Sequence, residues 1–171
     1  MKSKFMPTAV LGIICLVSAL LLALINIPTE AKIREDQRKK EMAALIEVLP
    51  GSEDFEEIGT DGLSTAVKAA YAELDGKGYV FKLEVKGYAD GLVIMCGVDA
   101  DGKIAGVKHI ESNETYGLEP ELNGAYIGKS GSVDKIIASG ATPNSATSNG
   151  YYTAITAALS AYELITARGG N

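Results

Sequence analysis

The chain of 171 residues is poor in the residues on which most catalytic and metal chemistry depends. It contains no tryptophan, one histidine (His109) and two cysteines (Cys15 and Cys96). Two cysteines so far apart in sequence cannot build a disulfide framework or a zinc site of the usual spacing. A Ser-His-Asp triad would have to use His109, because the chain has no other imidazole. We therefore expect no metal site, His109 to be structural, and Cys96, which lies in an apolar run, to pack in the core.

Positive charge is also scarce. Lysine and arginine total 16 against 22 aspartates and glutamates, a net charge of −6, which argues against a nucleic-acid partner. Residues 1–29 hold only Lys2 and Lys4, so residues 30–171 carry 14 basic and 22 acidic groups, a net charge of −8. The length corresponds to about one domain. The composition thus predicts one acidic domain after an uncharged N-terminal stretch.

The N-terminal stretch predicts a membrane anchor. No charged residue occurs from Phe5 to Thr29, and Ala9–Ile27 is almost wholly apolar. A bilayer core about 30 Å thick needs about 20 helical residues, which this stretch supplies. The apolar run is longer than that of a cleaved signal peptide, and no A-x-A-like site follows it. We therefore expect residues 1–29 to be an uncleaved anchor, although the Lys and Arg count alone would place its C-terminal flank inside.

The rest of the chain predicts an α+β architecture. Residues 30–50 read as a helical stalk that ends at Pro50-Gly51, and residues 51–171 as a small domain. Asp75-Gly76 and Asp101-Gly102 are turn signals. The periodicity predicts strands or helices at the following positions: a short helix at 64–74, strands at 79–85, 92–98 and 104–110, and a C-terminal helix at 149–167.

Two loops carry the residues that indicate a ligand site. The first loop, His109–Glu119, follows a predicted strand, and the second loop, Ser139–Ser148, precedes the final helix. The second loop contains small residues (Ser139, Gly140, Ala141) and then four hydroxyls, at Thr142, Ser145, Thr147 and Ser148. A helix N-terminus of this kind suits a phosphate group. The alternative is an ordinary capping loop, with Ser148 or Asn149 as the helix cap.

In their order along the chain these motifs resemble the FMN-binding domain family. The motifs are G-Y-x-x-G-L from Gly87, D-x-D-G-K-I from Asp99, E-T-x-G-L (Glu114, Thr115, Gly117, Leu118) and S-G-A-T (Ser139–Thr142). The resemblance covers roughly residues 5–168. The chain departs from the family pattern at Tyr116, where proline is usual, and at Pro143-Asn144-Ser145. It also departs at Asp134, which stands eight residues before Thr142 instead of six.

The resemblance implies a covalently bound cofactor. In this family a separate flavin transferase joins the phosphate of FMN to a threonine hydroxyl by a phosphodiester bond. The matching acceptor is Thr142, with Thr147 as the alternative. Ser139, Gly140, Ala141 and Ser145 would bind the cofactor beside it, and the first loop would place Glu114, Thr115, Gly117 and Leu118 next to the flavin.

The resemblance also implies a function. We expect a flavoprotein component, anchored in the cell membrane with its FMN domain on the extracytoplasmic side. It would relay electrons among the membrane subunits of an ion-translocating ferredoxin:NAD⁺ oxidoreductase of the Rnf type, and would not be a catalyst alone. The related flavoprotein component of a sodium-translocating NADH:quinone reductase, or a stand-alone flavoprotein, is the alternative. From the residues alone, a membrane-tethered anion sensor without a cofactor is a further alternative.

Overall fold

A computed structural model describes residues 5–112 and 117–169, without the side chains of residues 5–9, 22–34 and 36–37. The chain divides into two units, residues 1–42 and residues 43–171. The long helix α1 (Phe5–Val48) makes up the first unit and contributes its last turns to the second. Within the described residues, no helix is both long enough and apolar enough to cross a membrane.

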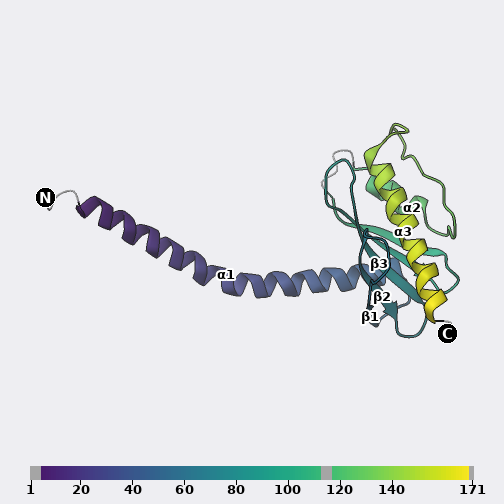
Figure 1. The fold of residues 1–171 in the computed structure, drawn as a ribbon, viewed down its shortest axis with the longest axis horizontal. Coiled ribbons are helices and arrows are strands. Elements are labelled where there is room, and N and C mark those ends of the chain that lie inside the picture. Colours follow the sequence, from purple (N-terminus) through teal and green to yellow (C-terminus); the bar gives the residue numbers. More distant parts are fainter. Residues whose placement is uncertain (1–4, 113–116, 170–171) are drawn as a thin grey trace. The chain divides into compact units, whose positions relative to one another are not determined.

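The second unit is built on a five-stranded antiparallel meander, in the spatial order β1-β2-β3-β4-β5. Two helices follow the sheet in sequence, and α3 lies across one of its faces (Figure 1). This arrangement confirms the α+β class. The bounds of the remaining elements are as follows: β1 Phe55–Ile58, β2 Val67–Glu73, β3 Gly78–Val85, β4 Leu92–Asp99, β5 Ile104–Glu111, α2 Glu119–Ala125 and α3 Ala146–Gly169.

The main core lies between α3 and one face of the sheet. Alternate side chains of the strands point into it, among them Phe81 and Leu83 of β3 and Cys96 of β4, all fully buried. Tyr151 and Ile155 meet them from α3 and are equally buried. The buried position of Cys96 confirms the expectation for this residue. Burial of each large apolar side chain contributes about 1.5–3 kcal/mol, so this layer fixes α3 on the sheet.

The other face of the sheet is covered by the end of α1. Leu45 and Val48 pack there in a second cluster with Val80 and Met95, all fully or nearly fully buried. The close approach depends on two glycines, Gly97 and Gly106, which are paired in register on β4 and β5. A Cβ on Gly106 would lie 2.7 Å from the carbonyl oxygen of Val48, and a Cβ on Gly97 would clash with the same carbonyl. An ion pair between Lys108 and Glu47 lies at the same contact.

The strands predicted at 79–85, 92–98 and 104–110 are all present, each within one residue of its expected bounds. The predicted turns are also found, with Gly76 and Gly102 at φ +77°, a conformation that favours glycine. The C-terminal helix is present as well, but begins three residues earlier than expected.

The helix expected at 64–74 is wrong, because residues 67–73 form β2. The alanines of this segment favour a helix on intrinsic propensity. They are instead paired with β3, with Ala70 opposite Phe81 and Ala72 opposite Tyr79. Tertiary pairing and burial of Val67 and Ala70 override the local preference.

Two short elements were not expected from the sequence. β1 has only four residues, too few for a clear alternation. α2 lies between the strand expected at 104–110 and the helix expected at 149–167, where no element was predicted. It nevertheless has a recognisable start: Pro120 stands in its first turn, between the acidic residues Glu119 and Glu121. Proline and acidic residues are both favoured in the first turn of a helix, so this signal was available.

Enlarging Gly106 is expected to loosen the contact between α1 and the sheet. Gly106→Ala should lower the free energy of unfolding by about 1–3 kcal/mol, because the new methyl group overlaps the Val48 backbone. Urea unfolding followed by circular dichroism measures this loss. Gly59→Ala is the matched control, since nothing lies within 4 Å of its Cβ position. Equal stability of the two variants would contradict the close packing.

The thiol of Cys96 is expected to be unreactive in the folded protein. Burial raises the pKa of this thiol to about 12, above its ordinary value of about 8.5. The folded state thus favours the protonated form. The contribution of the buried, protonated thiol to the free energy of unfolding is fully present below about pH 8.5, and it is lost as the pH rises toward 12. In a Cys15→Ser background, a thiol reagent at about pH 8 should label Cys96 only after denaturation. Rapid labelling of the native protein would contradict this prediction.

Candidate functional site

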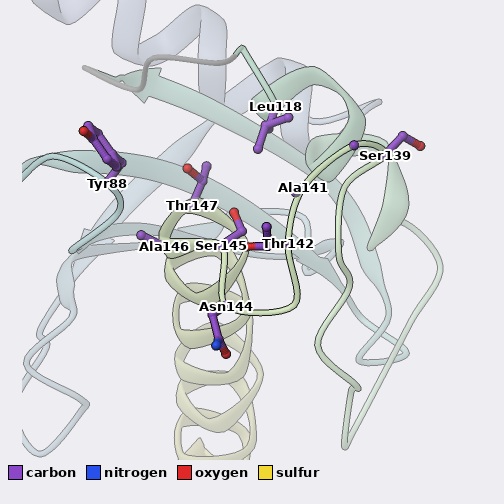
Figure 2. Close-up of a pocket in the computed structure, with 10 residues that line it drawn as sticks. Tyr88, Leu118, Ser139, Ala141, Thr142, Asn144, Ser145, Ala146 and Thr147 are labelled. Atoms are coloured by element: carbon purple, nitrogen blue, oxygen red, sulfur yellow. The ribbon is translucent and has the colours of Figure 1, made fainter.

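A cavity of about 610 Å³ lies at the start of α3. Figure 2 shows its walls: Tyr88 stands on one side and Leu118 on another, and the second loop runs along the side away from Tyr88 into the first turn of the helix. The lining residues are Tyr88, Leu118, Ser139, Gly140, Ala141, Thr142, Asn144, Ser145, Ala146 and Thr147. Three separate parts of the chain thus meet around one space.

The structure brings together most of the candidate residues of the second loop. Ser139, Gly140, Ala141, Thr142 and Ser145 all line the cavity. Thr142, the expected acceptor, is exposed and therefore accessible to another protein. Thr147, the alternative acceptor, lines the same cavity but is buried.

The first loop is represented in the cavity by Leu118. Gly117, beside it, is exposed with φ +60° but is not among the lining residues. Glu114 and Thr115 lie outside the described residues. The part of the first loop that the structure describes therefore contributes one apolar wall.

The second loop turns sharply before it becomes helix α3. The amide of Ala141 donates to the carbonyl oxygen of Ala138 at 3.0 Å, with Gly140 between them at φ +78°. The amide of Ser145 then donates to the Thr142 carbonyl oxygen at 2.9 Å. Two consecutive turns thus place Thr142 shortly before the helix. Any residue with a Cβ would be strained at position 140, because the φ angle there is positive.

Ser145 caps α3. Its Oγ accepts a hydrogen bond from the amide of Ser148 at 3.3 Å, and its carbonyl oxygen accepts one from the amide of Asn149 at 3.0 Å. The expected caps, Ser148 and Asn149, are therefore wrong, because both lie inside the first turn. The cap therefore supplies an acceptor for the Ser148 amide, and the positive end of the α3 dipole lies beside the cavity, which Ser145, Ala146 and Thr147 help to line.

A glycine allows the first turn of α3 to reach the loop that carries Tyr88. A Cβ on Gly150 would lie 2.9 Å from the carbonyl oxygen of Lys86 and 3.2 Å from the side chain of Leu92. The helix therefore approaches the end of β3 closely. Tyr88 follows two residues after Lys86 and stands at the cavity with 66% of its surface exposed.

Sequence reasoning did not identify Tyr88 as a site residue. It belongs to the G-Y-x-x-G-L motif, 54 residues before Thr142, and nothing local indicates that it shares a cavity with the second loop. The flanking glycines Gly87 and Gly91 were the available signal, because they mark a turn that brings an aromatic ring to a surface. Asn144 is a second missed lining residue.

Polar side chains outside the cavity lining join β5, α2 and α3. The Asn123 amide group lies between the Nδ1 atom of His109, at 3.1 Å, and the hydroxyl of Tyr151, which donates to its Oδ1 at 2.8 Å. The Glu119 carboxylate accepts a hydrogen bond from the hydroxyl of Ser112. His109 therefore links secondary structure elements and does not line the cavity.

A buried tyrosine fixes the segment that leads into the second loop. Tyr126, at the end of α2, accepts a hydrogen bond from the amide of Ile136 at 3.1 Å. Burial raises the pKa of the Tyr126 hydroxyl, although the hydrogen bond from Ile136 opposes this. The phenol therefore stays neutral and holds Ile136 three residues before Ser139.

The residues of the cavity fit a flavin mononucleotide. The volume is within the range of about 300–1,000 Å³ typical of organic ligand sites. Tyr88 and Leu118 offer aromatic and apolar surface to a planar ring. Helix amides and the hydroxyls of Thr142 and Ser145 suit a phosphate group. Within the described residues, no group of three or more His, Cys, Asp or Glu side chains could hold a metal ion.

Comparison with known proteins agrees with this fit. Residues 87–160 match the family described as the FMN-binding domain, a range that spans β4, β5, α2, both loops and most of α3. This part of the chain is thus an FMN-binding domain, as the motifs predicted.

Several characterised proteins resemble the chain over most of its length. It is 31% identical over 160 residues to the G subunit of the Na(+)-translocating ferredoxin:NAD(+) oxidoreductase complex of Acetobacterium woodii, covering 82% of this chain and 77% of that relative. It is 32% identical over 130 residues to the G subunit of the ion-translocating oxidoreductase complex of Pseudomonas aeruginosa, covering 68% of this chain and 61% of that relative. The corresponding protein of Methanosarcina acetivorans is 29% identical over 128 residues, with 67% and 68% covered. The chain belongs to the G-subunit family of ion-translocating oxidoreductase complexes. This confirms the relationship to Rnf-type complexes that the motifs predicted.

Removal of the cap of α3 is expected to weaken the site and the helix together. Ser145→Ala should lower the free energy of unfolding by about 1 kcal/mol, because the Ser148 amide loses its acceptor. Denaturant unfolding measures the change. Ser132→Ala, an exposed serine outside the helices and strands, is the control and should be neutral. A neutral Ser145→Ala would show that the hydroxyl does not cap the helix.

Proposed function

We propose that this protein carries FMN joined through its phosphate to the hydroxyl of Thr142. The observation that supports this most directly is the position of Thr142: exposed, in the cavity wall, and immediately before the capped N-terminus of α3. A phosphodiester there keeps one negative charge, which the positive end of the helix dipole stabilises. Attachment would be made by a separate flavin transferase.

In this proposal the two loops have different tasks. Ser139, Gly140 and Ala141 let the cofactor approach the backbone closely, since their side chains are small or absent. Ser145 shapes the first turn of α3 that faces the phosphate. Leu118, with the neighbouring residues Glu114, Thr115 and Gly117 of the first loop, would lie beside the ring, and Tyr88 would cover it from the opposite wall (Figure 2).

The bound flavin would serve electron transfer within a larger assembly. FMN accepts and releases electrons one or two at a time, whereas the protein supplies its position and surroundings. The relatives are named as subunits of ion-translocating oxidoreductase complexes, one of them a ferredoxin:NAD(+) oxidoreductase. We infer that this chain relays electrons between other membrane subunits of such an Rnf-type complex and is not a catalyst alone.

The N-terminal part of α1 would anchor the domain to the cell membrane. Residues 5–29 carry no charge. Eight large apolar side chains between Val10 and Leu21 are at least 50% exposed. Continuous apolar surface of this kind is unfavourable in water and favourable in a bilayer. The proposed organisation is an anchor at 1–29, a stalk at 30–50 and the FMN-binding domain at 51–171, with the domain on the extracytoplasmic side.

The attachment site is tested by replacing its hydroxyl. The wild-type chain and Thr142→Ala are expressed in cells that also make a flavin transferase, and are then denatured in SDS. We expect in-gel flavin fluorescence and an FMN-sized mass increment in the wild type and neither in Thr142→Ala, because no oxygen remains to form the ester.

Thr147→Ala is the matched control, because Thr147 lines the same cavity and is the alternative acceptor. It should keep the flavin. Loss of flavin in Thr147→Ala, with retention in Thr142→Ala, would move the attachment site to Thr147. A wild type that never gains flavin would favour the cofactor-free anion sensor.

A further inference from the structure

The side chains of α2 reach the two candidate loops and α3 from alternate positions. Glu119 bonds to Ser112 in the first loop, and Asn123 bonds to Tyr151 in α3. Between them, Glu121 is the residue that reaches the second loop. Its Oε1 atom accepts hydrogen bonds from both the backbone amide and the hydroxyl of Ser139, each at 2.9 Å.

The contact of Glu121 lies three residues before Thr142. A second contact holds the other side of the same threonine. The ammonium group of Lys135 donates to the carbonyl oxygen of Pro143 at 2.9 Å and to the side-chain oxygen of Asn149 at 3.1 Å. Thr142 therefore lies within a short, mostly exposed stretch that is held at both ends, by an anion at Ser139 and by a cation at Pro143.

These contacts are placed where they contribute little to the stability of the domain. Glu121 and Ser139 are both exposed, and exposed charged contacts usually add little to the free energy of folding. The cores on the two faces of the sheet contain neither residue. However, the two hydrogen bonds from the amide and the hydroxyl of Ser139 to Glu121 restrict the backbone conformation of the second loop after Ser139.

We propose that Glu121 is a positioning residue for flavin attachment. It holds the backbone at Ser139 so that Thr142 is presented to the flavin transferase in one conformation. This inference rests on the proposed attachment at Thr142. In that step the Thr142 hydroxyl loses its proton to a base of the transferase, and its oxygen forms a bond to phosphorus. The donor is a flavin nucleotide activated as a phosphoanhydride, whose bond to the leaving phosphate breaks. Glu121 touches none of the reacting atoms.

The test compares the rate of flavin attachment in full-length variants. Purified transferase and its flavin donor are added to the wild type, Glu121→Ala, Glu121→Gln and Glu163→Ala, and in-gel fluorescence and intact mass follow the product with time. Glu121→Ala should be modified roughly ten- to a hundredfold more slowly, because Thr142 is no longer held in the reactive position. Glu121→Gln should react at nearly the wild-type rate, since its amide oxygen still accepts both hydrogen bonds from Ser139. Glu163→Ala removes another exposed glutamate, on α3, and should have no effect.

Two further measurements separate positioning from a general loss of structure. The melting temperatures of all four proteins should agree, and hydrogen exchange should be faster in the peptide containing Ser139 only in Glu121→Ala. Wild-type attachment rates in Glu121→Ala, or a slow rate accompanied by a lower melting temperature, would overturn the positioning role while leaving attachment at Thr142 intact. A wild type that takes up no flavin would instead overturn the proposed function, and the positioning role with it.

Discussion

The packing of α3 against the sheet is the constraint on which the candidate site depends. Tyr151, Ala154, Ile155 and Ala158 are fully buried against the strands, so the helix has little freedom to shift along them. Its N-terminus is thereby fixed beside the end of β3, and the absence of a side chain at Gly150 lets it come close. The fixed end of this helix therefore forms one wall of the cavity, and the second loop lines the space beside it.

Hydrogen bonds outside α3 hold the second loop, just as the core holds the helix. The second loop has few apolar side chains of its own, so its conformation depends on polar contacts: Glu121 on one side of Thr142 and Lys135 on the other. Ser145 joins the loop to the helix as its cap. The core therefore decides where the site lies, whereas a few exposed polar groups decide which conformation of Thr142 is presented. Such a division would suit the proposed attachment, in which a second enzyme modifies the loop.

On the opposite face of the sheet, two glycines allow the end of α1 to pack closely. Gly97 and Gly106 leave room for the backbone at Val48, so the last turns of α1 lie directly on β4 and β5. The helix end is consequently part of the domain from about Ala43 onward. For an electron carrier this matters, because transfer between cofactors depends on how firmly each one is held within its own domain.

The amino-acid sequence by itself determined the elements with strong local signals and the family of the domain. The alternating run of β3, the continuous apolar run of β4, β5 after its Asp-Gly turn, and the long C-terminal helix were predicted, since each depends on a local pattern or on glycine at one turn. The motifs around Gly117-Leu118 and Ser139–Thr142 likewise indicated an FMN-binding domain, which the comparisons confirmed. Only the tertiary structure decided that the alanine-rich segment at 67–73 is a strand, because pairing with β3 outweighs its helical propensity. It also decided that Tyr88 lines the same cavity as Thr142, that Glu121 binds Ser139, and that Ser145 caps α3. Each of these contacts joins residues whose proximity depends on how α2, α3 and the sheet pack, and no local pattern in the chain encodes that packing.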